Sequence, residues 1–241
     1  MASYNFQLIS GAKGGALEHS LYVARKGHYK AKADLVLSGH GNFPDWAGGS
    51  PAVFWAAADA YERANGAAYR ELIIALPNEL VGNALLPLVE DLIRSLVGLR
   101  PYQYAVHSRR SSLQGTQNPH VHIMYSDRMP DGIERSPNRT FSRFNPHWPE
   151  RGGCRKADAG RTWARVHEDM LVMRKRAADI QNAHLARHGH DVRVDHRSLR
   201  EQGVLRTPER HLGPGFIQRM SATEKDAYVQ ARASAESSRT L

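Results

Sequence analysis

The sequence predicts an α+β fold that contains an antiparallel pair of strands. Short alternating apolar runs and longer amphipathic stretches follow one another in the order strand, helix, helix, strand, helix, strand, strand, helix. The last two strand segments are separated by a polar loop, which favours antiparallel pairing. With 241 residues, of which 41% are hydrophobic, the chain is long enough to bury one sizeable core.

The first part of the chain contains two strongly marked segments and one loop. Residues 4–10 alternate weakly between apolar and polar side chains and indicate a strand, which the glycine-rich segment GAKGG ends. A helix is predicted at 17–29, and the Gly, Pro, Asn and Asp residues at 39–51 indicate a loop. Ser50 then occupies the N-cap of a helix predicted at 51–65, because the proline that follows it suits a first helical turn.

The rest of the ordered chain continues this alternation. The sequence indicates a strand at 69–76, a helix at 83–97, strands at 101–107 and 120–126, and a long helix at 161–188. Gly189 is the expected cap of the long helix, and the residues expected to be buried along it include Trp163, Met170, Met173 and Ile180. We expect residues 1–190 to form the main domain, 191–230 a basic extension, and the small, polar segment 231–241 a disordered tail.

The net charge of +9 is concentrated in the second half of the chain. Residues 128–241 hold 22 basic and 14 acidic side chains, whereas residues 1–127 hold 11 and 10. Nucleic acid is the first partner to consider for such a surface, because basic side chains that neutralise phosphates release counterions. A merely soluble basic protein is the alternative interpretation.

The composition also argues against several classes of protein. The longest aliphatic run, residues 72–76, is far shorter than the roughly 20 apolar residues of a membrane span, so we expect no membrane insertion. The N-terminus lacks the charged and then apolar layout of a signal peptide, and we expect a cytoplasmic protein. The single cysteine, Cys154, excludes an internal disulfide framework and a cysteine-based zinc site.

Three histidines share a parity on the two late strands. In YQYAVH, the apolar face carries residues 102, 104 and 106, which leaves His107 on the opposite face. In HVHIMYS, the same reasoning leaves His120 and His122 opposite the apolar side chains. If the apolar faces align, the three imidazoles lie on one side of the sheet and could hold a catalytic metal with open coordination positions. Polar histidines on an exposed sheet face are the alternative.

Such a site in a basic protein suggests phosphodiester chemistry, and the identity of the attacking group decides the reaction. Water would make the protein a nuclease, whereas a tyrosine would make it a strand transferase that conserves bond energy as a phosphotyrosine. Tyr22 and Tyr29 are seven residues apart on the predicted helix 17–29, and both could point toward the sheet. Core packing is the alternative for either ring, and their spacing does not choose between them.

Five collinear segments resemble the MobA/MobL family of plasmid mobilisation relaxases. The segments are LYVARKGHY, AADAYERANG, ALPNEL, NPHVHIMYSDRMPDGIER and GHDVRVDHRSLREQGV. The resemblance runs from the N-terminus to about Phe216, and NPHVHIM followed by DGIER is its most specific part. It implies an HUH-type relaxase palm, in which helices flank a central antiparallel sheet whose central strands carry the histidines.

The resemblance also implies a reaction and its components. Site- and strand-specific nicking of single-stranded DNA at a transfer origin would leave a 5′-phosphotyrosine and a free 3′-OH, and religation would reverse the step. By motif position the nucleophile is Tyr22, the metal ligands are His107, His120 and His122, and the ion is Mn²⁺ or Mg²⁺. Accessory mobilisation proteins and a secretion-system coupling protein are the implied partners.

Acidic residues near the motifs are candidates to accept a proton or to orient a histidine. Glu71 and Glu79 match acidic positions of the family, whereas Ile73 stands where the family has a further acid. Glu79 could equally favour a helix N-terminus, and Asp127 is a weaker candidate. The departure at Ile73 motivates one alternative, a DNA-binding remnant without catalysis. A metal nuclease with water as the attacking group is the other.

A segment after the histidine strands interleaves basic and aromatic side chains, as single-strand binding requires. We expect it to guide DNA toward the metal, with a solvated loop that tucks in an aromatic anchor as the alternative. Phe141 and the Arg151, Arg155 and Lys156 group belong to this segment, and the predicted DNA-binding residues are Arg109, Arg110, Arg135, Arg139, Arg143, Phe144 and Trp148.

Overall fold

The computed structural model describes residues 4–110, 117–205 and 214–237. The chain divides into two compact units, of which the larger comprises residues 1–108 and 119–196 and the smaller comprises residues 109–118 and 197–241. The domain boundary expected at residue 190 stays a prediction. Within the described ranges, no helix combines the length and the apolarity needed to cross a membrane.

The larger unit is built on a five-stranded antiparallel sheet with the strand order β1-β3-β5-β4-β2. This confirms the predicted α+β class. The strands are β1 (Phe6–Ala12), β2 (Leu35–Gly41), β3 (Ala67–Ala75), β4 (Tyr102–Arg110) and β5 (Gln117–Tyr125). The helices are α1 (Ala16–Val23), α2 (Pro51–Tyr61), α3 (Leu85–Leu96), α4 (Pro137–Thr140) and α5 (Trp163–Arg187).

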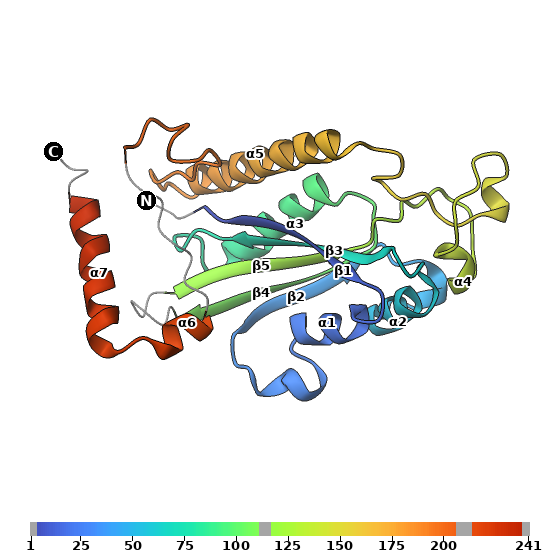
Figure 1. Cartoon of the computed structure of the whole chain (residues 1–241), viewed down its shortest axis with the longest axis horizontal. Helices are drawn as coiled ribbons and strands as arrows, with labels where there is room; N and C mark the ends of the chain where they lie inside the picture. The colour runs from blue at the N-terminus through green and yellow to red at the C-terminus, as the bar shows by residue number, and fades with distance from the viewer. Residues whose placement is uncertain (1–3, 111–116, 206–213, 238–241) are drawn as a thin grey trace. The chain divides into compact units, whose positions relative to one another are not determined.

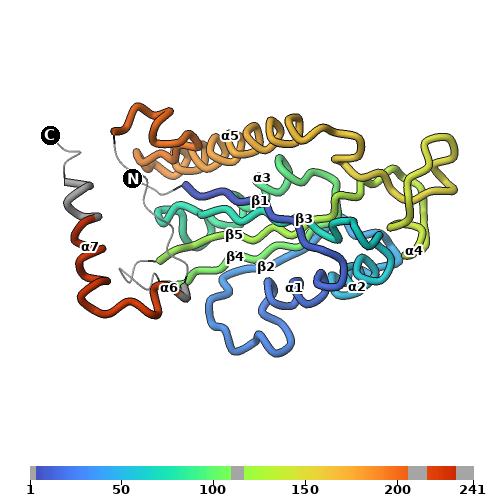
Figure 2. Tube along the Cα trace, in the orientation of Figure 1, coloured from blue at the N-terminus to red at the C-terminus, as the bar shows by residue number. Residues whose placement is uncertain are grey.

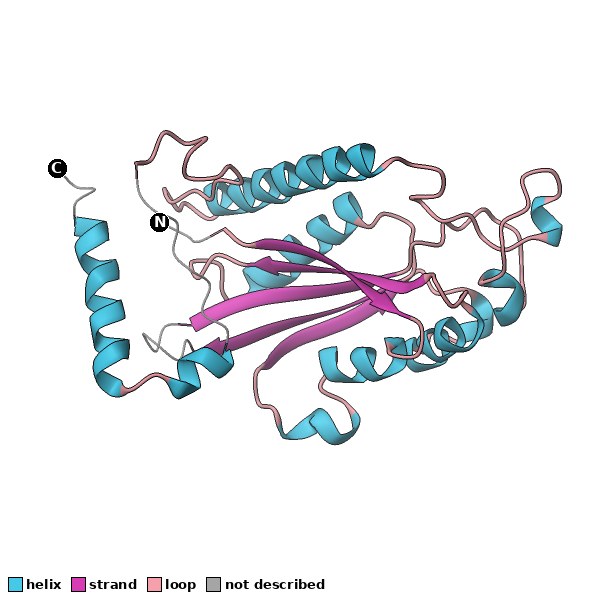
Figure 3. Ribbon diagram, in the orientation of Figure 1, coloured by secondary structure: helices cyan, strands magenta, loops and turns pink. Residues whose placement is uncertain are grey.

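Helices cover both faces of the sheet, with α3 and α5 on one side and α1 and α2 on the other (Figures 1 and 3). The alternate apolar side chains of β4 and β5, which the sequence predicts on one face of the sheet, pack in the first of these interfaces. Val106, Val121 and Ile123 are fully buried there against leucines of α3 and α5. A second, aromatic cluster joins α2 to the other side and includes Phe54, Trp55 and Met124.

Polar contacts fix α1 both to α2 and to the sheet. The carboxylate of Asp59, on α2, accepts hydrogen bonds from the backbone N–H groups of Gly14, Ala16 and Leu17, at 2.7 to 2.9 Å. This satisfies donors that a helix N-terminus leaves without partners. Near the middle of α1, Ser20 donates to the buried amide of Gln103 on β4 at 2.8 Å. The position of α1, which carries Tyr22, is therefore set from two sides.

The region from α1 to β2 differs from the prediction. The helix expected to reach residue 29 ends at Val23, because Arg25 adopts a left-handed conformation with φ 53° and Gly27 follows with φ 59°. A 3₁₀ turn, Gly27–Ala31, then carries Tyr29 before the chain reverses into β2 (Figure 2). Tyr22 and Tyr29 therefore do not share a helix.

Strand β2 lies partly in the segment predicted to be a loop. Its glycines indicated a loop, but Gly39 and Gly41 face two tyrosine rings of β4. A Cβ at Gly39 would lie 2.7 Å from Tyr104 Cε1, and one at Gly41 would lie 2.6 Å from the Tyr102 hydroxyl oxygen. The glycines leave room for the neighbouring aromatic rings, a pairing that a reading of turn residues cannot detect.

The remaining helices agree with the prediction at most of their ends. Ser50 accepts a hydrogen bond from Val53 N at the start of α2, and Gly189, with φ 77°, follows the end of α5. Met170, Met173 and Ile180 pack against the core as expected. Trp163 does not: as the first residue of α5 it is 80% exposed and stacks on His167.

In its described residues, the smaller unit contains the helices α6 (Pro214–Arg219) and α7 (Ala222–Ser237). Ser221 and Glu224 form a reciprocal capping box at the start of α7, in which Ser221 N donates to Glu224 at 2.8 Å and Glu224 N donates to Ser221 Oγ at 3.2 Å. The tail expected to be disordered from residue 231 is therefore helical as far as Ser237, and residues 238–241 lie outside the described ranges.

Candidate active site

The three predicted histidines lie together on the face of the sheet that α1 covers. The ring centroids are 4.8 Å apart for His107 and His122, 5.1 Å for His120 and His122, and 5.7 Å for His107 and His120. One ring nitrogen of each lies within 4.8 Å of the others. The parity argument thus placed these side chains correctly.

A buried carboxylate orients one of the histidines. Glu71 on β3 is 1% exposed and accepts a hydrogen bond from His122 Nδ1 at 2.7 Å and another from His19 Nε2 at 3.0 Å. Burial alone would raise the pKa of Glu71, but the hydrogen bonds from His122 and His19 lower it to about 2. A carboxylate on Nδ1 leaves Nε2 of His122 to face the cluster, the arrangement that commonly supports a metal-bound imidazole.

His107 links the cluster to the end of α1. It is fully buried, and its Nε2 donates to the carbonyl oxygen of Val23 at 2.8 Å. Burial lowers the pKa of His107 to about 4, so the ring is neutral at physiological pH. Neutral imidazole is the form that binds metals. Because Nε2 of His107 donates to Val23, its Nδ1 is the nitrogen left for a cation, and Arg25 approaches that atom to 3.2 Å. A divalent cation held by the three histidines would therefore displace this contact with Arg25.

Tyr22 is the residue immediately before Val23 and stands in a cationic environment. The Arg25 guanidinium lies 4.6 Å from the centroid of the Tyr22 ring, and Lys32 Nζ lies 4.3 Å from it. The Tyr29 ring meets Tyr22 edge-on at 5.1 Å, although the two residues lie on different elements. The structure therefore brings both candidate tyrosines to the same place.

The two tyrosines differ in what their surroundings do to the hydroxyl group. Tyr29 donates its hydroxyl hydrogen to Glu18 at 2.7 Å. That hydrogen bond to Glu18, more than any burial, raises the pKa of Tyr29. The raised pKa makes the Tyr29 phenolate harder to form, whereas Glu18 is also placed to accept its proton, so this contact does not choose between the two tyrosines.

Arg25 is the functional candidate that the sequence reasoning missed. Its guanidinium makes a forked ion pair with Asp34 at 2.7 and 2.9 Å, and it also donates to the Tyr22 carbonyl oxygen at 2.7 Å. The same group lies 3.2 Å from His107 Nδ1. One buried arginine thus contacts the helix end that carries Tyr22 and a histidine of the cluster. Its left-handed backbone, which no sequence pattern announces, makes this geometry possible.

The acidic candidates differ in the side chains that they contact. Glu71 joins the histidines, whereas Glu79 forms no hydrogen bond or ion pair with any residue that the structure describes, and its Oε2 atom is buried without a partner there. Asp127 pairs with Arg70 at 2.7 Å. Ile73 lies opposite His122 in the β3–β5 register, so the position where the family has a further acid is apolar beside the cluster.

The predicted DNA-binding residues are not equivalent. Arg135 differs from the expectation, because its side chain is 2% exposed, pairs with Asp131 and donates to the carbonyl oxygens of Pro149 and Gly152. It holds the loop together instead of facing solvent. Phe141 is likewise fully buried in the aromatic cluster.

Other members of the set are accessible. Arg139, Arg143 and Arg109 are exposed, Trp148 is 55% exposed beneath Arg151, and Phe144 is half-buried. The side chain of Arg110 lies outside the described residues. Arg143 and Phe144 line a pocket of about 400 Å³ together with Arg63, Arg70, Arg128 and Lys156, and we call it the basic pocket.

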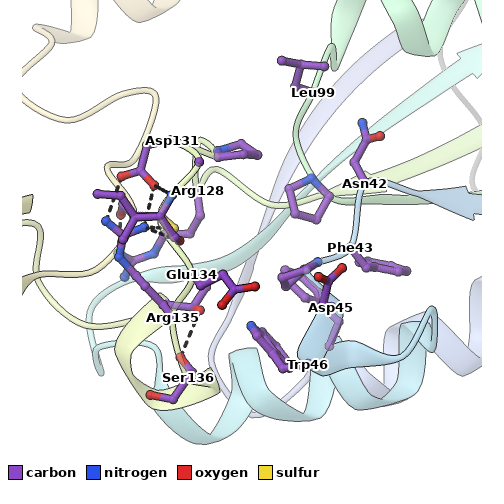
Figure 4. Close-up of a pocket in the computed structure, with 18 residues that line it drawn as sticks. Asn42, Phe43, Asp45, Trp46, Leu99, Arg128, Asp131, Glu134, Arg135 and Ser136 are labelled. Carbon is purple, nitrogen blue, oxygen red and sulfur yellow. Dashed lines mark hydrogen bonds and ion pairs between the residues drawn. The ribbon is translucent and has the colours of Figure 1, made fainter. Parts of the chain in front are cut away.

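A larger cavity, of about 760 Å³, is different in character. Phe43, Asp45 and Trp46 form one wall, and the loop that carries Glu134 and Arg135 forms the opposite wall (Figure 4). Arg135 is paired with Asp131 there, so the carboxylates of Asp45 and Glu134 are the charges left without an ion pair among the described residues. This cavity is larger than the basic pocket, but neither the histidine cluster nor Tyr22 lines it.

Comparison with known proteins assigns the family. Residues 15–222 match the MobA/MobL family model. The chain is 42% identical over 209 residues to the 43 kDa relaxation protein of Salmonella typhimurium, covering 86% of this chain and 56% of the relative. It is 38% identical over 224 residues to Mobilization protein A of Escherichia coli, covering 90% of this chain and 30% of the relative. The chain thus spans about half or less of the length of these relatives.

A solved structure supports the fold. A chain from work on the molecular basis of vancomycin resistance transfer in Staphylococcus aureus aligns with a TM-score of 0.55 at 24% identity, over 82% of this chain and all of the other. The match to the family model extends over most of the sequence and includes Tyr22, Glu71 and all three clustered histidines. The chain belongs to the MobA/MobL family.

Proposed function

We propose that this chain is the nicking unit of a plasmid mobilisation relaxase, which cuts single-stranded DNA at a transfer origin and rejoins it. The observation that carries the proposal is the hydrogen bond from His107 to the carbonyl oxygen of Val23, the residue after Tyr22. That bond fixes the end of α1 against the histidine cluster. A tyrosine nucleophile and a candidate metal centre are thereby held in one site.

His107, His120 and His122 would hold the cation, with Glu71 orienting His122. When bound, the cation would withdraw charge from a non-bridging oxygen of the scissile phosphate. An all-nitrogen donor set favours Mn²⁺ over Mg²⁺, which prefers oxygen ligands. Lys32 places positive charge beside Tyr22 and would draw the phosphate toward it, whereas the charge of Arg25 is paired with Asp34.

In the proposed reaction, the Tyr22 hydroxyl oxygen attacks phosphorus. The new bond between that oxygen and phosphorus forms as the bond from phosphorus to the 3′ oxygen breaks. The phenolic proton leaves Tyr22, and the departing 3′ oxygen gains a proton to become a free 3′-OH. The phosphotyrosine retains the energy of the broken bond, so the reverse attack by a 3′-OH can rejoin DNA.

The DNA surface in this proposal comprises Arg139, Arg143, Phe144 and Trp148, all in the larger unit. Arg109 and Arg110 belong to the smaller unit and stay separate candidates for DNA binding. Arg135 is left out because its guanidinium is buried and paired. Accessory mobilisation proteins and a coupling protein of a secretion system are the further partners we propose for the whole relaxase. A cytoplasmic location goes with this role.

A denaturing protein gel tests the proposal. The chain is incubated with labelled single-stranded oligonucleotides from its transfer origin, with Mn²⁺ or with EDTA. We expect a labelled protein band that requires Mn²⁺, disappears in Tyr22→Phe and persists in Tyr29→Phe. Cleavage without a labelled band would support a nuclease that uses water, and tight binding without cleavage would support a non-catalytic DNA-binding protein.

A further inference from the structure

The basic pocket joins segments that are far apart in the sequence. One wall comes from the turn between α2 and β3, which carries Arg63, and another comes from the segment after α4, which carries Arg143 and Phe144. The Arg143 backbone is fixed, because Gly153 N donates to its carbonyl oxygen at 3.0 Å. The pocket is thus a built feature of the larger unit.

Most charges around this pocket neutralise one another. Glu62, which is 2% exposed, pairs with Arg128 at 2.9 Å and with Lys156 at 3.2 Å. Arg70 pairs with Asp127 at 2.7 Å and with Asp158 at 3.1 Å. Three cations therefore face three carboxylates, and these residues form the wall without leaving a net charge for a ligand.

Arg63 and Arg143 remain as the exception. Both side chains are exposed, and neither guanidinium makes a hydrogen bond or ion pair with a residue that the structure describes. Guanidinium groups bind phosphate oxygens through two parallel hydrogen bonds. Two such groups at one pocket, in addition to a balanced set of ion pairs, indicate an anionic ligand.

Phe144 adds a surface for a base. It lines the same pocket and is half-buried, so its position is supported by the protein while part of it stays accessible. Aromatic rings bind nucleobases by stacking, whatever their sequence. The 760 Å³ cavity of Figure 4 lacks this combination, because the charges there that have no ion pair among the described residues are the carboxylates of Asp45 and Glu134, which would repel phosphate.

We propose that the basic pocket binds one nucleotide of the single-stranded substrate, with its phosphate held by Arg63 and Arg143 and its base against Phe144. The volume of about 400 Å³ suits a single nucleotide and not a duplex. This inference rests on the proposed function for the identity of the polymer. It adds Arg63, which lies in the AADAYERANG segment but had no predicted role, and it defines a place where the strand is bound.

Fluorescence anisotropy tests the phosphate contacts. A labelled octathymidine is titrated with Arg63→Ala, Arg143→Ala and the double variant in EDTA at several salt concentrations. Each single substitution should reduce the slope of log affinity against log salt by about 0.7, and the double variant by about 1.4. Arg165→Ala, which removes an exposed arginine of α5, is the matched control and should leave the slope unchanged.

An abasic probe tests the base contact. Phe144→Ala should weaken binding of the octathymidine about tenfold, but should not change binding of an octamer whose sugars carry no bases. Inorganic phosphate at millimolar concentration should compete weakly with both probes, which separates a grip on the polymer from a site for free phosphate. Strong competition by free phosphate with equal binding of both probes would overturn the nucleotide assignment.

These outcomes are separable from the relaxase reaction, because binding is measured without metal. If the double variant binds with the affinity and salt slope of Arg165→Ala while the wild type forms a covalent adduct, the nucleotide subsite is wrong and the relaxase stands. If the slopes fall as expected while no adduct forms, the subsite stands and the reaction is wrong. Unchanged thermal unfolding of Arg63→Ala, Arg143→Ala and the double variant is expected, since neither guanidinium has a hydrogen-bond or ion-pair partner to lose among the described residues.

Discussion

On each side of the sheet a histidine is hydrogen-bonded to a carboxylate, and only one of the two pairs belongs to the candidate site. On the face under α1, His122 donates to Glu71 at 2.7 Å. On the opposite face, His184 of α5 donates to Asp91 of α3 at 2.9 Å. The two hydrogen bonds are nearly identical in length, so their chemistry alone does not separate a functional pair from a structural one.

The surroundings of the two pairs are what differ. Glu71 is almost fully buried and binds a second histidine, and the His122 ring lies about 5 Å from two others. Asp91 is one-third exposed and also pairs with Arg94, and His184 is 1% exposed between two helices. A histidine–carboxylate pair therefore indicates a metal site only where further donors converge on it. Elsewhere it joins two helices.

The largest expected contrast comes from removing each histidine. His122→Ala should reduce nicking more than about 100-fold, because the metal supplies several kcal/mol of charge stabilisation, and should abolish Mn²⁺ binding in calorimetry. His184→Ala should leave Mn²⁺ binding unchanged and lower the free energy of unfolding by about 2 kcal/mol. Equal Mn²⁺ affinity in wild type and His122→Ala would show that the cluster is not a metal centre.

Substitution of the two carboxylates, Glu71 and Asp91, should give the same contrast in Mn²⁺ binding with smaller effects. Glu71→Gln keeps the shape of the side chain but removes the charge that orients His122, so we expect Mn²⁺ affinity to fall about 10- to 100-fold. Asp91→Asn is the matched change on the other face and should leave the affinity within about twofold of wild type. A comparable loss of affinity in both variants would mean that the effect is a general one on folding.

Arg25→Lys tests whether the histidine face also positions the nucleophile. Lysine keeps the charge but cannot make the fork that holds Asp34 and the end of α1, so we expect nicking to slow about tenfold with unchanged single-strand affinity. Arg94→Lys, in the arginine–aspartate pair of the opposite face, is the control and should leave the rate unchanged. A lower affinity in Arg25→Lys with an unchanged rate would assign Arg25 to binding instead.

The smallest effect is the pH dependence of the structural pair. The hydrogen bond from His184, despite some opposing desolvation, lowers the pKa of Asp91 below its unfolded value near 4. The hydrogen bond between His184 and Asp91 therefore contributes fully to stability above the unfolded pKa of Asp91. This contribution is lost as the pH falls through the pKa of Asp91 in the folded protein. The partly exposed pair should give about 0.5 kcal/mol. The Tm difference between wild type and Asp91→Asn should shrink between pH 5 and 2, and a difference that grows there would contradict this assignment.

The histidine cluster was predictable because strand parity is a strong constraint. A shift of one residue would have moved the apolar residues of β4 and β5 out of the core, so Val106 and Val121 fixed where His107 and His122 point. The fold class followed from the same patterns. The predictions that Ser50 caps the start of α2 and that Gly189 follows the end of α5 were also correct, since capping depends on residues that are close in sequence.

The remaining features depend on contacts that sequence spacing does not reveal. Gly39 and Gly41 looked like loop residues because the tyrosines that cover them lie more than 60 positions away in the chain. Arg135 and Arg143 are indistinguishable by pattern, yet Arg135 is held by Asp131 and three carbonyl oxygens, whereas the Arg143 guanidinium has no partner among the described residues. Arg25 was missed because its role follows from a left-handed backbone conformation.

The claim at the centre of this account is that the site transfers a strand instead of hydrolysing it. The most direct test isolates the covalent adduct and supplies a second oligonucleotide that ends in a free 3′-OH. We predict that the DNA is released from Tyr22 and joined to the new 3′ end, which gives a longer labelled strand on a sequencing gel. Release of DNA with a 5′-phosphate and no joined product would contradict the account and identify a hydrolase.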